Sequence, residues 1–589
     1  MAAPVGKTEV LAIRDAMRLR GPDGEGLWLS ADGRVGLAHR RLAILDLSDA
    51  GAQPMRLDGD PQAPIITFNG EIYNYRELRA RLEAQGSRFR STSDTEVLLH
   101  LYRRDGAAMV ERLRGMYAFV IWDPARRQLF AARDPFGIKP LYYADDGRTI
   151  RLASQVKALL AGGGIDTTPE PAGHAGFFLF GHVPEPFTLY RGIRSLPAGG
   201  VLIIDDGGQA SERQAIDIID ALVAAEANAG AAPTADAAIA AALADSVRAH
   251  LVADVDVGAF LSAGKDSTTI VALAARGGQK LNTLTLGFAE FAGTANDEIP
   301  LAEAVAARFS ARHRTVNISR EDFLADRDRL LAAMDQPTID GVNTYFVARA
   351  AAQAGMKVAL SGLGGDEVFA GYSNFTRIPR IVSAVGWLTR WPALGVAVRQ
   401  ATRHIATRFG NRKYASLIEY AGDHAQAYLL CRALYLPWEL PQVLDAEFAR
   451  EGLERLAVFD RLRAIEGRLS SARAKVTALE MSFYMRNQLL RDADWAGMAH
   501  SLEIRVPLVD TVLLKTLAPR IVGREPFSKD DMVETIRADL PATLLNRAKS
   551  GFMVPVAAWI GGGEPSRFDH RAWARRVMDG TAGASLCTQ

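Results

Sequence analysis

The chain has 589 residues, of which 48% are hydrophobic and 23% charged, and its formal net charge is +1. This length is too great for a single hydrophobic core, so two or more domains are expected. The near-neutral charge gives no electrostatic support for a nucleic-acid or membrane partner. The two cysteines, Cys431 and Cys587, lie far apart in sequence and indicate neither a disulfide framework nor a zinc site.

The compartment predicted from these features is a reducing cytoplasm. The first twenty residues lack the long apolar core of a signal peptide. No uninterrupted apolar run approaches the roughly 20 residues that a membrane-spanning helix needs. We therefore expect small-molecule partners, with no nucleic acid and no membrane.

The first part of the chain reads as mixed α and β structure. Helical spacing predicts helices over 9–19 and 73–86, each ended by a turn signal. β-Branched and aromatic residues between turn signals predict strands over the following ranges: 36–45, 65–69, 116–122, 128–132 and 140–144. Many strands with few helices predict a layered α+β domain.

Beyond an alanine-rich stretch over 221–238, strands and helices alternate. Strands are expected over 255–262, 281–288, 313–318 and 357–361, with helices between them. This alternation predicts a doubly wound parallel sheet, followed from Ile378 by a mostly helical part. The predicted division is a first domain at 1–205, a linker at 206–238, a second domain at 239–560 and a partly ordered tail at 561–589.

The strongest chemical signal is the stretch FLSAGKDSTT, residues 260–269, which follows a strand and opens a helix. Small residues at 262–264 let backbone N–H groups approach phosphate oxygens, and the helix adds its positive end. Asp266 can hold Mg²⁺, and Lys265 adds a positive charge. The spacing does not match a Walker loop, because five residues separate Gly258 from Gly264.

A second loop, VALSGLGGDEVFAGY at 358–372, repeats the same logic after another apolar strand. Its glycines again permit close backbone approach, and Asp366 supplies a second carboxylate. Two carboxylates on loops after parallel strands predict a clamp for Mg²⁺ on pyrophosphate. One such loop could be an ordinary turn, but two with the same logic favour a nucleotide site.

Together with FNGEIYN at 68–74, these loops resemble the glutamine-dependent asparagine synthetase family. Other matching stretches are RGPDGEG, HRRLAILDLS, SDTE, GMYAFVIWD, RDPFGIKPLYY, MAHSLEIRVPLVD and NRAKSGFMVP, in the same order and spacing. The resemblance implies an N-terminal-nucleophile-type glutaminase sandwich followed by a pyrophosphatase-loop synthetase domain. It also implies that ATP activates a carboxylate as an acyl-adenylate, which ammonia from glutamine then attacks. The family habit suggests a homodimer.

The resemblance assigns roles to particular residues. The implied glutamine-binding residues are Arg41, Asn69, Gly70, Glu71 and Asp94. The implied ATP-binding residues are Leu261, Ser262, Gly264, Lys265, Ser267, Leu286, Gly287, Ser361 and Gly362. Asp266 and Asp366 would hold Mg²⁺, and Lys549 would stabilise charge on the phosphates as the adenylate forms.

The sequence departs from the family pattern in two main places. Family members begin Met-Cys-Gly-Ile, and that cysteine is the nucleophile, whereas residue 2 here is Ala. A truncated start and a relic glutaminase both explain this, and the retained glutamine-binding residues favour truncation. The second departure is Leu363, which stands where the family has an acid, so aspartate as acceptor is in doubt.

The interpretation is an ATP-dependent, AMP-forming amide ligase, with asparagine synthetase as the default. The first alternative is an amidotransferase of a natural-product or surface-polysaccharide pathway that acts on another carboxylate. A catalytically silent regulatory protein is opposed by the intact Asp266, Asp366 and Lys549. A tRNA-modifying enzyme is opposed by the +1 charge and by the glutaminase-like half.

Overall fold

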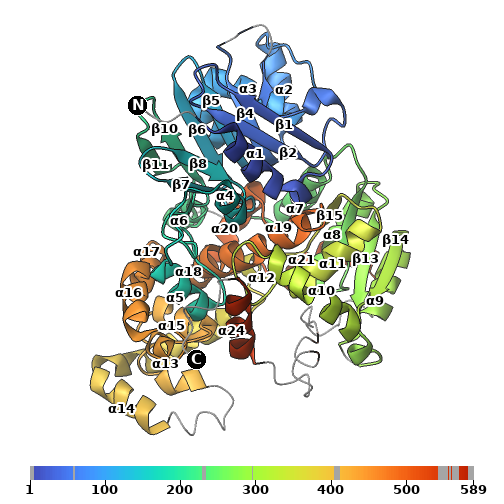
Figure 1. The fold of residues 1–589 in the computed structure, drawn as a ribbon. Coiled ribbons are helices and arrows are strands. Elements are labelled where there is room, and N and C mark those ends of the chain that lie inside the picture. The colour runs from blue at the N-terminus through green and yellow to red at the C-terminus, as the bar shows by residue number, and fades with distance from the viewer. Residues whose placement is uncertain are drawn as a thin grey trace.

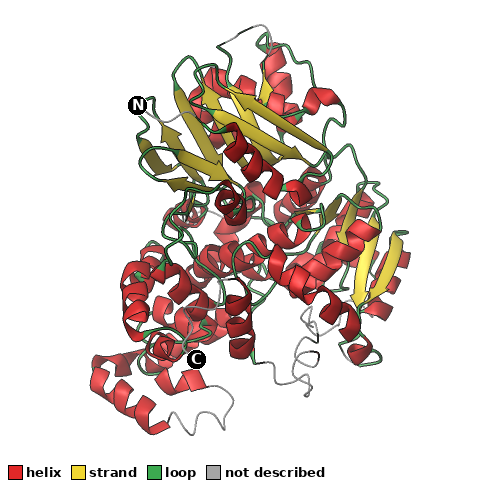
Figure 2. Ribbon diagram, in the orientation of Figure 1, coloured by secondary structure: helices red, strands yellow, loops and turns green. Residues whose placement is uncertain are grey.

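The computed structural model describes residues 5–57, 60, 62–228, 234–294, 296–402, 412–540, 555, 559 and 569–581. These residues form an N-terminal lobe built on antiparallel sheets and a C-terminal lobe built on a parallel sheet with many helices (Figures 1 and 2). The predicted fold class is thereby confirmed: an α+β sandwich is followed by a doubly wound parallel sheet and a helical C-terminal part.

The N-terminal lobe contains eleven strands among the described residues. They are β1 (Gly24–Leu29), β2 (Gly36–Arg41), β3 (Met55–Arg56), β4 (Ile65–Ile72), β5 (Gly115–Asp123), β6 (Gln128–Arg133), β7 (Tyr142–Asp145), β8 (Ile150–Ala153), β9 (Arg194–Ser195), β10 (Gly200–Ile204) and β11 (Ala210–Gln214). Its main sheet has the order β11-β10-β6-β5-β4-β3 and is antiparallel throughout. Two smaller antiparallel sheets, β1-β2 and β8-β7-β9, complete the set.

Alternation of side chains along the main sheet gives the lobe its layers. On one face, Phe68 and Phe119 pack with apolar residues of the helices α2 (Tyr75–Ala84) and α3 (Asp94–Asp105). On the other face, Ala118 and Val120 pack with residues of the two smaller sheets. The helices α1 (Lys7–Ala16) and α4 (Val156–Gly162) contact each other and cover the outside of those sheets.

The C-terminal lobe is organised around a parallel sheet of order β14-β13-β12-β15-β16. Its strands are β12 (Val257–Phe260), β13 (Asn282–Gly287), β14 (Arg312–Asn317), β15 (Val358–Leu360) and β16 (Glu503–Arg505). The helices around the sheet are α7 (Asp236–His250), α8 (Lys265–Arg276), α9 (Ile299–Arg308), α10 (Arg320–Ala333), α11 (Val342–Gln353), α12 (Gly365–Val368), α19 (Arg491–Met498), α20 (Thr511–Val522) and α21 (Lys529–Glu534).

A helical region follows the second loop, as the sequence predicts from Ile378. Its helices are α13 (Asn374–Val385), α14 (Pro392–Thr402), α15 (His424–Arg432), α16 (Ala446–Leu456), α17 (Val458–Glu466) and α18 (Ala472–Leu479). A π-helix, Glu480–Leu490, joins α18 to α19. From the first half of the chain, α5 (Pro171–Phe180) packs against α16, so the two halves are intertwined here.

Two stretches outside the two predicted domains contain ordered elements. The expected linker 206–238 contains β11, which pairs with β10, and also α6 (Ile219–Ala227), whose Ile219 and Leu222 are buried. The expected tail 561–589 contains α24 (His570–Thr581), which packs on α10 and buries Trp573. In both places the few buried apolar residues are too widely spaced among other residues to give a clear hydrophobic periodicity.

Buried charges join the two lobes. Arg20 makes a bidentate contact with Asp494, with N–O distances of 2.7 and 2.9 Å. Beside it, Lys139 Nζ lies 3.3 Å from Glu503, which also accepts a hydrogen bond of 2.9 Å from Arg505 Nε. All five side chains are almost fully buried. Buried ion pairs of this kind fix the relative position of the lobes. A shift that separates one of these charges from its partner leaves it buried without a counter-charge.

In the described residues, no single helix has the length and apolar content needed to cross a bilayer. The bent pair Asn374–Arg390 and Pro392–Thr402 meets both criteria when its two parts are taken together.

The Arg20–Asp494 contact predicts a measurable loss of stability when one charge is removed. Asp494→Asn should lower the free energy of unfolding by about 3 kcal/mol, because Arg20 stays buried without its counter-charge. Asp206→Asn removes the exposed partner of Arg34 and Arg127 and should cost less than about 1 kcal/mol. Urea denaturation of both variants beside the wild type makes the comparison, and equal effects would contradict it.

Candidate functional site

A cavity of about 690 Å³ opens where β12 and β15 end, between the loops that follow them. Ten of the predicted residues line it: Leu261, Ser262, Gly264, Lys265, Asp266, Ser267, Leu286, Ser361, Gly362 and Asp366. Gly287 is the exception among the predicted nucleotide-binding residues. A Cβ at Gly287 would meet Asn317 Oδ1 at 2.2 Å and Ile299 Cδ1 at 2.5 Å, so helix and strand packing explain this glycine.

The first loop turns the chain tightly from β12 into α8. Ala263 adopts a left-handed φ of 53°, and the Oγ atoms of Ser262 and Ser267 lie 3.2 Å apart across the turn. Gly264 is the N-cap of α8 and supplies no side-chain cap. Backbone N–H groups at this helix end, together with the helix dipole, form a natural site for phosphate oxygens.

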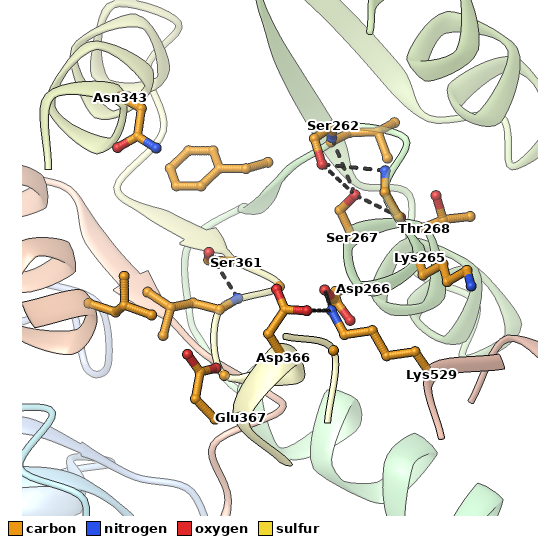
Figure 3. Close-up of a pocket in the computed structure, with 18 of the residues that line it drawn as sticks. Ser262, Lys265, Asp266, Ser267, Thr268, Asn343, Ser361, Asp366, Glu367 and Lys529 are labelled. Carbon is orange, nitrogen blue, oxygen red and sulfur yellow. Dashed lines mark hydrogen bonds and ion pairs between the residues drawn. The ribbon is translucent and has the colours of Figure 1, made fainter. Parts of the chain in front are cut away.

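Lys529 joins the two predicted metal-binding carboxylates. Its Nζ lies 2.5 Å from Asp266 Oδ2 and 2.7 Å from Asp366 Oδ1, and Figure 3 shows the ammonium between them. Burial alone would lower the pKa of Lys529, but the two carboxylates outweigh it and raise that pKa above its ordinary value. Sequence reasoning missed Lys529, which begins α21 and is 263 residues from Asp266.

The second loop leaves no room for larger residues beside Asp266. A Cβ on Gly362 would meet Asp266 Cβ at 2.8 Å, and one on Gly365 would meet Asp266 Oδ1 at 2.4 Å. Between these glycines, Leu363 is half-buried and packs against the hydrophobic core. Its backbone N–H donates to Ser361 Oγ at 3.4 Å. The loop therefore holds Asp266 and Asp366 close together while offering no acid at position 363.

The carboxylate pair suits a Mg²⁺ ion that is completed by other ligands. Mg²⁺ prefers carboxylate and phosphate oxygens and keeps several waters. No group of three or more His, Cys, Asp or Glu side chains that could hold a metal occurs in the described part of the chain. Asp266 and Asp366 fit as two ligands, with phosphate oxygens and water needed for the rest. The predicted Lys549 lies outside the described residues.

Part of the cavity wall is acidic. Asp340, Glu367 and Asp492 all line it, together with Tyr372 and Tyr484. Burial raises the pKa of Glu367 to about 7 and that of Asp492 to about 8. None of the three acids was among the predicted site residues. Glu367 lies in the second loop next to Asp366 and was passed over, whereas Asp340 and Asp492 lie in stretches with no recognisable spacing.

A second cavity, of about 150 Å³, lies in the N-terminal lobe. It is lined by all the predicted glutamine-binding residues: Arg41, Asn69, Gly70, Glu71 and Asp94. Gly70 has φ of 143°, and a Cβ there would meet Met116 O at 2.0 Å, so only glycine fits. Arg41 is held by backbone carbonyls, including that of Ser48 at 2.9 Å from its Nη1.

The acids of the second cavity are strongly buried. Burial raises the pKa of Asp94 to about 7, although Asp94 Oδ2 accepts a hydrogen bond of 2.9 Å from the Ile72 N–H. Burial also raises the pKa of Glu71, whose Oε1 lies 3.4 Å from Arg505 Nη2. Arg505 thus connects the floor of this cavity to the charges between the lobes.

A small cavity lies between the two larger ones. Its volume is about 10 Å³, and its wall is mostly apolar, with Lys139 and Asp494 as the charged members. Met498 lines both this cavity and the N-terminal one. Ala493 and Ile504 line both this cavity and the larger one at the ends of β12 and β15, which we call the nucleotide-side cavity. The three cavities therefore follow one another across the junction of the lobes.

Comparison with known proteins places the whole chain in a family. Residues 3–214 match the glutamine amidotransferase domain model, and residues 238–581 match the asparagine synthase model. A Mycobacterium tuberculosis protein, named provisionally as a glutamine-hydrolysing asparagine synthetase, is 34% identical over 96% of this chain and 87% of its own length. Asparagine synthetase 1 of Bacillus subtilis is 31% identical over 95% and 85%.

A more distant relative bears a different name. A Gibberella zeae protein named as an amidase is 26% identical over 93% of this chain and 85% of its own length. Among solved structures, a Bacillus subtilis glutamine phosphoribosylpyrophosphate amidotransferase covers 53% of this chain and 64% of its own at 19% identity. Its TM-score of 0.29 is too low to bear on function.

The chain joins a glutamine amidotransferase domain to a domain of ATP-dependent carbon–nitrogen ligases. The chain belongs to the asparagine synthase family, as the match over 238–581 and the 34% identity show. It is an asparagine synthetase-like ligase with small-molecule substrates.

The ammonium of Lys529 occupies the position between two carboxylates that a divalent cation can also take. Lys529→Met should lower the thermal unfolding midpoint in the absence of metal, because Asp266 and Asp366 repel each other. Millimolar Mg²⁺ should raise the midpoint of this variant by more than that of the wild type, since a ligand that binds the native state stabilises it. Lys265→Met, which breaks only a pair with Asp530, is the control. The same Mg²⁺ response in all three proteins would contradict the assignment.

Proposed function

We propose that this chain activates a carboxylate with ATP, forming an acyl-adenylate and pyrophosphate, and then converts it to an amide with ammonia. The observation that carries this proposal is the pair Asp266 and Asp366, joined by Lys529 at the ends of neighbouring parallel strands. A charge clamp of this kind beside a helix N-terminus suits the binding of a polyphosphate.

Each part of the nucleotide-side cavity has a role in this proposal. The backbone of residues 262–264 and the N-terminus of α8 hold phosphate oxygens, and Leu261 and Leu286 form the apolar wall for the adenosine. Asp266 and Asp366 would hold Mg²⁺, and the bound ion would neutralise phosphate charge. Lys529, released from the carboxylates, then has an ammonium available for the departing pyrophosphate.

The proposed reaction has two steps, adenylation of the acceptor carboxylate and its amidation by ammonia. A carboxylate oxygen of the acceptor attacks the α-phosphorus of ATP, and pyrophosphate leaves. Ammonia nitrogen then attacks the acyl carbon, AMP leaves with the electron pair of the broken C–O bond, and the nitrogen loses a proton. Enclosure of both steps within the cavity protects the adenylate from water.

The N-terminal cavity supports glutamine as the source of ammonia. In this proposal Asp94 accepts from the α-ammonium of glutamine, Arg41 pairs with its α-carboxylate, and Asn69 and Gly70 supply N–H donors. The small cavity lined by Ala493, Ile504 and Met498 gives ammonia a sheltered path to the acyl-adenylate. The described residues that line the N-terminal cavity include no cysteine, so ammonium is the nitrogen source for a first test.

Aspartate is the default acceptor, and a second candidate is an amidotransferase acting on another carboxylate. Leu363 favours the second, because a leucine between Gly362 and Gly364 can neither accept a proton nor bind an ammonium. The relative named as an amidase supports a variant chemistry within the family.

The proposal predicts AMP, pyrophosphate and an amide in equal amounts from ATP, Mg²⁺, ammonium and a carboxylate. Asp266→Asn and Asp366→Asn should each lower kcat/KM by about 100-fold or more, because each removes charge needed at the phosphates. Asp328→Asn, on the exposed face of α10, is the matched control and should retain activity. ADP and phosphate in place of AMP would refute the proposal, as would full activity of either site variant.

Glutamine binding should strengthen as pH rises. Asp94, with a pKa of about 7, is protonated below that pH and charged above it, and only the charged form pairs with the α-ammonium of glutamine. Calorimetric titration should therefore give an affinity at pH 6 that is roughly tenfold lower than at pH 8, in proportion to the charged fraction of Asp94. Asp94→Asn should bind weakly at both pH values. A wild-type affinity that is the same at both would exclude this role.

A further inference from the structure

The acidic wall of the nucleotide-side cavity consists of Asp340, Glu367 and Asp492. Asp266, Asp366 and Lys529 form what we call the phosphate clamp. Glu367 follows Asp366 directly on α12, so it lies next to this clamp, as Figure 3 shows. Tyr372, whose hydroxyl donates to Glu367, has its ring centroid 5.9 Å from that of Tyr484 on the π-helix. Asp340 is followed by Gly341, where a Cβ would lie 3.2 Å from Asp492 Cγ. The three acids therefore form one part of the cavity.

Among the described residues, no group donates a hydrogen bond to one of the two Glu367 carboxylate oxygens. The side chain has 0% exposure, and Oε1 accepts a hydrogen bond of 2.8 Å from the Tyr372 hydroxyl. Oε2 is buried and has no hydrogen-bond partner. A buried carboxylate oxygen without a donor is costly, so a partner from a bound molecule is the natural completion.

Asp340 and Asp492 lie together on the same wall. Asp492 accepts hydrogen bonds from Trp495 Nε1 at 2.8 Å and from Thr338 Oγ1 at 2.9 Å, so its side chain is fixed. Asp340 Oδ1 accepts from the Gly341 N–H at 2.9 Å. These donors are neutral. The charge of Arg491 acts to lower the pKa of Asp492, and that of Arg432 acts to lower the pKa of Asp340, but burial outweighs both and raises each pKa.

The arginines near the wall do not line the cavity. Arg432 lies against Tyr484, 3.6 Å from its ring centroid, and its Nη2 is 2.7 Å from Glu480 Oε2. Arg491 donates from Nη1 to the Val183 carbonyl at 2.7 Å, while its Nε and Nη2 have no hydrogen-bond partner among the described residues. Burial lowers the pKa of His570, the remaining basic group near Asp340, and keeps it neutral at neutral pH. Of the described residues that line the cavity, Lys265 and Lys529 are the basic ones, and both are paired with carboxylates of the nucleotide-binding part.

We propose that the acceptor is a carboxylic acid that carries a protonated amino group and no second carboxylate. Its ammonium would lie among Glu367, Asp340 and Asp492 and donate to Glu367 Oε2, while its carboxylate points to the phosphate clamp. A second carboxylate on the acceptor would meet this wall as a like charge. The inference rests on the proposed function and specifies its substrate class.

Acceptors of matched length test the proposal directly. At pH 8.5, AMP release would be measured with ATP, Mg²⁺, ammonium and one acceptor at a time. One set is 5-aminopentanoate, pentanoate and glutarate, and another is 4-aminobutanoate, butanoate and succinate, with aspartate alongside. At the better length, the amino acid should exceed its neutral and its dicarboxylate counterparts by at least about tenfold in kcat/KM, as a charge-assisted hydrogen bond implies.

Two variants locate the effect. Glu367→Gln and Asp492→Asn keep the side-chain shape, and each should raise KM for the amino acid by about tenfold or more while leaving KM for the neutral acid within about twofold. Asp328→Asn is the control for both. An equal loss with the amino acid and the neutral acid would mean a structural role for the wall and would overturn the inference.

The outcomes separate this inference from the proposed function. AMP release that is greatest with pentanoate, glutarate, succinate or aspartate overturns the amino-acid acceptor and leaves AMP-forming amidation standing. Absence of AMP with every acceptor, in a protein that still unfolds cooperatively, overturns the proposed function and the inference with it. A preference for an amino acid that Glu367→Gln abolishes supports both.

Discussion

Two carboxylates held within reach of a single cation are the constraint on which the nucleotide-side cavity depends. Asp266 and Asp366 leave neighbouring parallel strands, and Lys529 lies between them at 2.5 and 2.7 Å. Their repulsion has to be balanced, and the same balance can be supplied by a metal ion on a polyphosphate. The glycines at 362 and 365 follow from this, because any Cβ there would collide with Asp266.

Buried charge also governs how the two lobes meet. The contacts of Arg20 with Asp494 and of Arg505 with Glu71 and Glu503 lie around the small cavity that follows the two larger ones. Such pairs hold the lobes in one arrangement, and their cost of desolvation is met only when the geometry is kept. Fixed lobes keep the sequence of cavities continuous, which the proposed transfer of ammonia requires.

The sequence was sufficient for the fold class, and most of the site residues it predicted line one of the two larger cavities, since both loops follow strands with strong local signals. It was insufficient where partners are distant or signals are weak. Lys529 lies in the stretch SKDD, which reads as an ordinary helix start, and only folding brings it to Asp266. Gly287 has a packing reason that spacing does not reveal. The acidic wall brings Glu367 of the second loop together with Asp340 and Asp492, which are distant in sequence and belong to no motif.

The central claim is that an acyl-adenylate forms on the acceptor carboxylate, and isotope transfer tests it most directly. The acceptor that supports amide formation would be labelled with ¹⁸O in both carboxylate oxygens and turned over with ATP, Mg²⁺ and ammonium. The account predicts that one ¹⁸O atom appears in the phosphate of AMP, because the acceptor oxygen attacks the α-phosphorus. Label in inorganic phosphate, or AMP that contains none, would contradict it.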